Sequence, residues 1–120
     1  MIIKNTALWT LSFGHLSVDL YSNLLPVAYP LLMASLDLNY AQVGLLATFY
    51  MLGSSLSQPL FGYLTDRFGS RLLASIGIAW IAMFMGLVGF AWSYHSLLAI
   101  VALAALGSGA YHPQGAANAS

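Results

Sequence analysis

Apolar residues occupy four long runs along the chain, separated by three short polar segments. The runs cover residues 6–36, 40–65, 72–92 and 97–120, and the segments between them hold Asp37-Leu38-Asn39, Asp66 to Arg71, and Ser93 to Ser96. A bilayer core of about 30 Å requires about 20 apolar residues in a helix. The pattern therefore predicts an all-α membrane protein with four transmembrane helices.

Composition strengthens this prediction and excludes other classes of protein. The chain is 60% hydrophobic and 5% charged, with a formal net charge of zero, whereas soluble domains carry about 25% charged residues. Nucleic acid is excluded as a partner because phosphate binding requires clustered Lys and Arg, and the lipid bilayer is expected as the surroundings. The chain has no cysteine and no metal-ligand spacing, phosphate loop or nucleophilic triad. We therefore expect no cofactor, no metal and no enzymatic activity.

Basic residues suggest an orientation. Lys4 precedes the first run, and Arg67 and Arg71 lie between the second and third. Four alternating spans place all three on one face, which the positive-inside rule assigns to the cytoplasm. Both termini are then expected to be cytoplasmic.

The first run contains an acid at membrane depth. Asp19 lies about a dozen residues from its start, where a charged group costs about 2.5–3.5 kcal/mol, so such groups usually face a water-filled cavity or a bundle interior. A polar stripe at helical spacing surrounds it, made of Ser12, His15, Asp19, Ser22, Asn23 and Pro26. His15 and Asp19 are four residues apart and can pair. Histidine changes its charge near neutral pH, which favours a proton-sensitive pair in a transport pathway, and a purely structural pair is the alternative.

The segment between the second and third runs carries the most specific motif. It reads Gly62-Tyr63-Leu64-Thr65-Asp66-Arg67-Phe68-Gly69-Ser70-Arg71, which resembles the signature loop of the major facilitator superfamily, although Ser70 stands where a basic residue is common. The resemblance implies a twelve-helix fold, of which this chain is the first third. It also implies that Gly62, Asp66, Arg67, Gly69 and Arg71 act in a conformational switch. By their chemistry, Gly62 should allow close helix packing, Gly69 a tight turn, and Asp66 a helix cap or a pair with an arginine.

Two further stretches are similar to fosmidomycin-resistance-type efflux transporters. They are His15-Leu16-Ser17-Val18-Asp19 with the later Tyr29-Pro30-Leu31-Leu32, and Gly107-Ser108-Gly109-Ala110-Tyr111-His112-Pro113. Members often carry an acid after this last proline, whereas this chain has Gln114. In the superfamily the first and fourth helices line a central cavity, which implies that His15 and Asp19 share a proton or substrate pathway with Tyr111, His112 and Gln114. The alternative is that His112-Pro113 only bends the helix.

Small residues are frequent in the second and fourth runs. Since lipid offers no hydrophobic drive between helices, small residues allow the close approach that holds them together. We therefore expect a packing role for Gly53, Ser54, Ser55, Ser57, Gln58 and Gly62 in the second run, and for Gly107, Ser108 and Gly109 in the fourth.

Three functional hypotheses follow from these observations. The first is a secondary, proton-coupled, alternating-access transporter that exports small molecules across the plasma membrane of a bacterium, of which this chain is a truncated piece that lacks its remainder. The second is a complete four-helix exporter of the small multidrug type, acting as a dimer. The third is a membrane interaction subunit without transport activity.

Overall fold

The protein is described from a computed structural model that covers the main chain of residues 6–119 and the side chains of residues 6–113. Within that part the chain forms helices α1 (Thr6–Leu36), α2 (Tyr40–Phe68), α3 (Ser70–Leu87) and α4 (Tyr94–Ala119), with the short 3-10 helix η2 (Val88–Phe90) after α3. The described residues contain no strand. The protein is therefore all-α, as the apolar runs predict.

The connection between α1 and α2 is fixed by local sequence. Asp37 has a φ of 52°, and the amide of Leu38 donates 3.0 Å back to the Met33 carbonyl, which is the hydrogen bond of a Schellman helix end. Asn39 then caps α2 through a reciprocal pair of hydrogen bonds with Gln42, each 2.9 Å long. Such capping boxes satisfy amides that a helix start leaves unpaired.

The segment predicted as a loop at 66–71 is almost entirely helical, which corrects that expectation. α2 continues to Phe68 and α3 begins at Ser70, so that Gly69 alone makes the turn. Gly69 has φ 91° and ψ 147°, a conformation that is open essentially to glycine only. A single glycine can therefore connect two antiparallel helices that the polar composition suggested were farther apart.

The polar segment before α4 acts as a helix cap. The amide of Ser96 donates to the Ser93 hydroxyl, and the Ser96 hydroxyl accepts from the amides of Trp92 and Ser93. α4 therefore begins at Tyr94, within the segment expected to precede it.

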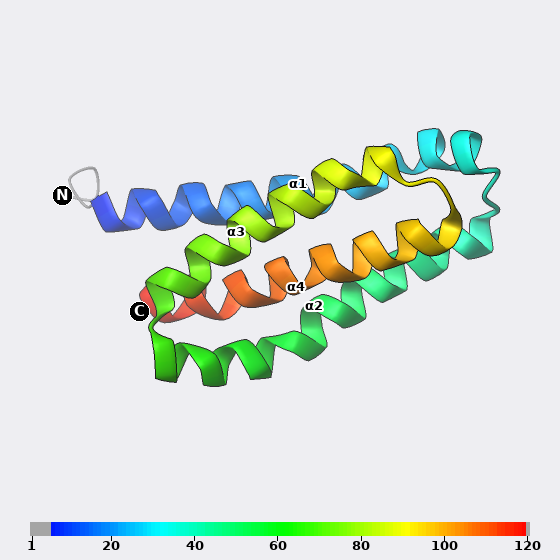
Figure 1. Cartoon of the computed structure of the whole chain (residues 1–120). Helices are drawn as coiled ribbons and strands as arrows, with labels where there is room; N and C mark the ends of the chain where they lie inside the picture. Colours follow the sequence, from blue (N-terminus) through cyan, green and yellow to red (C-terminus); the bar gives the residue numbers. More distant parts are fainter. Residues whose placement is uncertain (1–5, 120) are drawn as a thin grey trace.

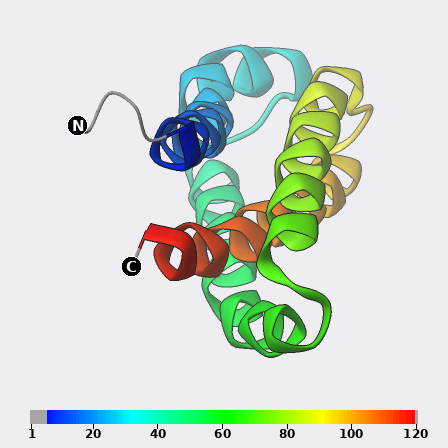
Figure 2. The same cartoon turned by 90° about the vertical axis from the view of Figure 1, so that its left-hand side faces the viewer.

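Helix α4 is the central element of the bundle. It lies among the other three helices in Figures 1 and 2, and packs most extensively against α3 and α2. Glycines permit these contacts: a Cβ on Gly107 would lie 2.8 Å from the Gly77 carbonyl of α3, and one on Gly53 would lie 2.9 Å from Ala105. The packing role expected for small residues is therefore met at Gly53 and Gly107. It is not observed at Gly62 in the described part of the chain, where a Cβ would meet nothing within 4 Å.

Large apolar side chains cover much of the outer surface. Val27, Leu31 and Leu56 are each at least 73% exposed, which is unusual for a protein surrounded by water. Two helices of the described part, Ser70–Phe90 and Tyr94–Pro113, are long and apolar enough to cross a membrane. α1 and α2 do not reach that criterion, because His15, Asp19 and Asn23 in α1 and the serines of α2 lower their hydropathy. By length and composition, the structure therefore supports two of the four expected transmembrane helices, α3 and α4.

Candidate functional site

A cavity of about 350 Å³ lies between α1, α2 and α4. Its volume is within the range of small-molecule sites. The lining consists of Asp19, Ser22, Leu25, Pro26 and Tyr29 from α1, Ala47, Tyr50, Met51, Ser54 and Ser55 from α2, and Ser108 and His112 from α4. The site thus combines an apolar wall with hydroxyl groups, one carboxylate and one imidazole.

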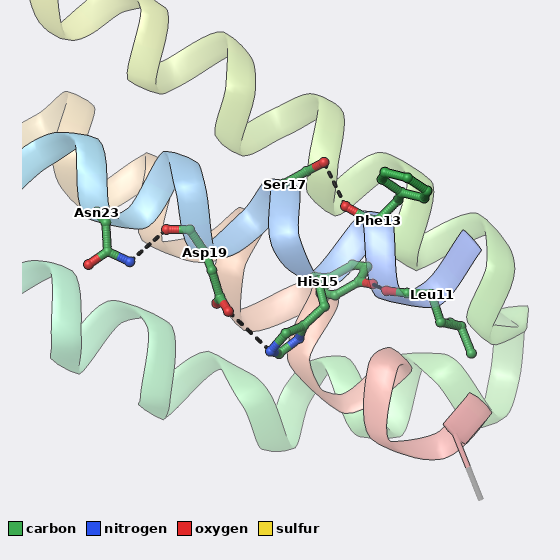
Figure 3. Close-up of polar contacts among 7 residues, drawn as sticks. Leu11, Phe13, His15, Ser17, Asp19 and Asn23 are labelled. Carbon is green, nitrogen blue, oxygen red and sulfur yellow. Dashed lines mark hydrogen bonds and ion pairs between the residues drawn. The ribbon is translucent and has the colours of Figure 1, made fainter. Parts of the chain in front are cut away.

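Asp19 and His15 form the pair that their spacing predicts. The His15 Nε2 atom lies 3.2 Å from the Asp19 Oδ2 atom, and the two side chains are 55% and 49% exposed. Figure 3 shows both on the same side of α1, with Ser17 pointing away from them. The carboxylate therefore reaches the cavity while it remains paired, and it is not sealed among apolar neighbours.

His112 extends this cluster across to α4. Its ring lies edge-on to the ring of His15, with centroids 5.7 Å apart and planes inclined by 72°. His112 also lines the cavity beside Asp19. Two helices that are far apart in the sequence thus bring two imidazoles and one carboxylate together. Among the described residues, however, no group of three such side chains has the geometry to hold a metal ion.

Tyr111 lies beside the two histidines but outside the lining of the cavity, with its ring centroid 6.3 Å from that of His15 and 6.5 Å from that of His112. It is only 2% exposed and is absent from the cavity lining; its hydroxyl donates 2.9 Å to the main-chain carbonyl of Leu11. Tyr111 thus has the proximity to His15 and His112 that was predicted, although its hydroxyl bonds to the backbone of α1 instead of lining the cavity; its share in the pathway stays a prediction. The side chain of Gln114 lies outside the described residues.

Helix α2 contributes a wall of the cavity that the sequence did not reveal. Tyr50, Ser54 and Ser55 line it, although the serines were expected only to pack. Ser54 does both, since it is buried and its hydroxyl donates 3.2 Å to that of Ser108. Tyr50 and Ser54 are four residues apart and therefore lie on one face of the helix. This spacing is the sequence feature from which the polar wall of α2 could have been predicted.

Prolines inside the helices release backbone acceptors at the cavity. Pro26 lies in α1 and Pro59 in α2. Each lacks the amide that would bond to the carbonyl four residues earlier. Those carbonyls belong to Ser22 and Ser55, and both residues line the cavity.

The predicted switch residues lie away from this cavity, around the junction of α2 and α3. Asp66 and Arg67 belong to the last turn of α2, and Arg71 to the first turn of α3. All three are exposed. No ion pair joins Asp66 to either arginine within the described part of the chain, and α3 begins without a side-chain cap. The pairing and capping expected of Asp66 are therefore not observed.

Comparison with known proteins assigns the family. The model of the Major Facilitator Superfamily matches residues 11–120. The chain belongs to the major facilitator superfamily. The resemblance in the signature segment around Gly69 is thereby confirmed, and the protein is an integral membrane protein.

Curated members of the superfamily are similar over most of this chain. A fosmidomycin resistance protein from Escherichia coli (strain K12) is 33% identical over 107 residues, which is 89% of this chain and 26% of that protein. An uncharacterised transporter of the superfamily from Bacillus subtilis (strain 168) is 31% identical over 84% of this chain and 25% of its own length. A probable 4-methylmuconolactone transporter from Cupriavidus pinatubonensis is 34% identical over 83% of this chain and 22% of its own length.

This chain spans about a quarter of the length of these curated superfamily members. No solved structure matches it. The similar proteins are named transporters, which agrees with the expectation that the chain is not an enzyme. Membership in this superfamily also favours the first functional hypothesis over the small multidrug type.

Proposed function

We propose that this chain forms part of a secondary transporter that moves small molecules across the plasma membrane by alternating access. In this proposal all four helices span the bilayer, and transport is outward and coupled to protons. The observation that carries it is the position of Asp19, which reaches a cavity of about 350 Å³ while paired to His15. Family membership and the name of the fosmidomycin resistance protein support export.

The proton-coupling step rests on the charge of the Asp19 and His15 pair. A proton on this pair changes the charge of the cavity wall, and any ligand or proton that drives the cycle must bind its two conformations with different affinity. His112 lies within reach of the same charge through its edge contact with His15. These three side chains are proposed as the proton-sensitive part of the pathway, with Gln114 nearby in the sequence.

The switch step is assigned to the junction of α2 and α3. Asp66, Arg67 and Arg71 are exposed, so their charges are available to another part of the transporter. The start of α1, this junction and the end of α4 lie at the same end of the bundle in Figure 1. By the positive-inside rule this end is cytoplasmic, which places both termini inside the cell.

The experiment is flux through the natural-length protein that contains this chain, reconstituted in liposomes with an imposed pH gradient. Fosmidomycin and 4-methylmuconolactone serve as two separate probes. We expect Asp19→Asn to abolish the pH-driven component of flux, since it removes the carboxyl group that can carry a proton while keeping the size of the side chain. Asp37→Asn is the matched control, because Asp37 lies in the turn after α1 and should leave flux unchanged.

Proton-dependent flux that persists in Asp19→Asn would contradict the coupling role. Absence of flux of both probes in the unaltered protein would contradict export of these compounds. If no solute crosses the liposome membrane at all, the hypothesis of a membrane interaction subunit without transport activity is favoured instead.

A further inference from the structure

Two hydroxyl groups join facing walls of the cavity. The Oγ atom of Ser22 on α1 and the hydroxyl oxygen of Tyr50 on α2 are 2.6 Å apart, and either can donate. Both residues line the cavity. The bond is partly buried, so water competes with it less than at an open surface.

This hydrogen bond joins α1 and α2 where the two helices pack little against each other. α1 packs mainly against α4 and α3, and α2 mainly against α4, whereas α1 and α2 touch each other little. The cavity occupies the space between them, with Ser108 and His112 of α4 in its lining. The pair of hydroxyls is therefore a direct polar contact between α1 and α2 at the level of the cavity.

The chemistry of the pair determines what can replace it. Each hydroxyl can both donate and accept a hydrogen bond. A ligand that brings a hydroxyl or carbonyl oxygen restores a partner to Tyr50 when the bond to Ser22 opens. An apolar ligand of equal size leaves polar groups without partners, which is unfavourable in partly buried surroundings. Neighbouring lining residues offer the same neutral chemistry, since Tyr29, Ser54 and Ser55 also carry hydroxyls.

We propose that Ser22 and Tyr50 form a hydroxyl clasp across the cavity, and that Tyr50 selects small molecules whose hydroxyl or carbonyl group can replace this bond. The proposal rests on the proposed function, in which this cavity receives the transported molecule. It adds a determinant of specificity that is independent of Asp19 and of protons.

The clasp is testable by the chemistry of an introduced thiol. The 120 residues contain no cysteine, so Ser55→Cys places a reporter in the cavity lining of the natural-length transporter, prepared on a cysteine-free background. Two neutral probes, 2-hydroxyethyl methanethiosulfonate and ethyl methanethiosulfonate, differ by one hydroxyl. Ser75→Cys, on the exposed side of α3, supplies the reference ratio of their reaction rates.

We expect the ratio of hydroxyethyl to ethyl reaction rates to be about fivefold higher at Ser55→Cys than at Ser75→Cys, as one net hydrogen bond would give. Tyr50→Phe combined with Ser55→Cys should bring the ratio down to the reference. Ser22→Ala combined with Ser55→Cys should leave the ratio at least as high, because it frees the Tyr50 hydroxyl for the probe. The double substitution should give the ratio of Tyr50→Phe alone, because without the Tyr50 hydroxyl the loss of Ser22 frees no partner for the probe.

Matched controls separate the clasp from general effects of substitution. Tyr63→Phe removes an exposed hydroxyl from α2, and Ser17→Ala removes one that bonds within α1; both should retain the preference. Equal ratios at Ser55→Cys and Ser75→Cys in the otherwise unaltered protein would overturn the proposal. So would a preference that survives in Tyr50→Phe, or one that is lost in Ser22→Ala. These reactions require neither flux nor a pH gradient, so their outcome is distinguishable from a failure of the proposed function.

Discussion

Tyr111 and Gly14 share one volume between α4 and α1. A Cβ atom on Gly14 would lie 2.5 Å from the hydroxyl oxygen of Tyr111, so the ring of Tyr111 fits only because residue 14 has no side chain. This contact holds α4 against the turn of α1 that carries His15. The same region holds the contact of His15 with His112, whose ring centroids are 5.7 Å apart.

Removal of the Tyr111 hydroxyl should weaken this contact while the ring still fills the space beside Gly14. Tyr111→Phe keeps the ring but loses the 2.9 Å hydrogen bond to Leu11. We expect the free energy of unfolding to fall by about 1 kcal/mol, the usual net value of such a bond. Thermal unfolding of the purified protein in detergent measures it. Tyr63→Phe, at a tyrosine that is 61% exposed, is the control, and an equal loss in both variants would show that the bond to Leu11 contributes nothing.

Two glycines in helix interiors should respond in opposite directions to alanine. Gly107→Ala places a Cβ 2.8 Å from backbone atoms of both Gly77 and Ile81, which forces α3 and α4 apart and should cost about 1–3 kcal/mol. Gly62→Ala meets open space and should stabilise α2 by up to about 1 kcal/mol through helix propensity. Unfolding temperatures of the two variants provide the comparison. A loss in Gly62→Ala as large as in Gly107→Ala would mean that Gly62 packs against something outside the described contacts.

Acidification should weaken the contact between α1 and α4 at the two histidines. Histidines gain a proton as the pH falls through about 8 to 5, and rings with centroids 5.7 Å apart repel when both are charged. Asp19 is the acid beside them, and a single carboxyl group can offset only one of two positive rings; Tyr111 also contacts both rings. We expect the free energy of unfolding to be highest at about pH 8 and to fall by about 1 kcal/mol at about pH 5.

His112→Gln tests this repulsion, because it leaves one imidazole beside Asp19. The loss of stability on acidification should shrink in this variant, as followed by thermal unfolding across the pH range. His95→Gln, at the exposed start of α4, should retain the full loss. If His112→Gln and the unaltered protein lose stability equally, the two rings do not repel in the folded protein.

The helices themselves could be predicted because the signals for them are local. The start of α2 follows from Asn39 and Gln42, whose side chains satisfy unpaired amides, and the turn after α2 from Gly69, whose φ of 91° suits a residue without a Cβ. The pair of His15 and Asp19 belongs to the same kind of prediction, because residues four apart on one helix are neighbours whatever else packs around them. The length of α2 was underestimated, since charged residues near Asp66 are as compatible with a helix end at a membrane surface as with a loop.

The sequence alone therefore determined that four helices form, where the turns between them lie to within a few residues, and that an acid pairs with a histidine inside the first helix. Only the tertiary structure decided that α2 is a wall of the cavity, that Tyr50 meets Ser22, and that Tyr111 is buried against Gly14. It also decided that, among the described residues, a Cβ on Gly62 would meet nothing within 4 Å. The reason is physical: periodicity shows which residues share a face of a helix, but α4 has neighbours on several sides. Which of its faces meets α1, α2 or α3 depends on how closely glycines let each pair approach, and that is a property of two segments together.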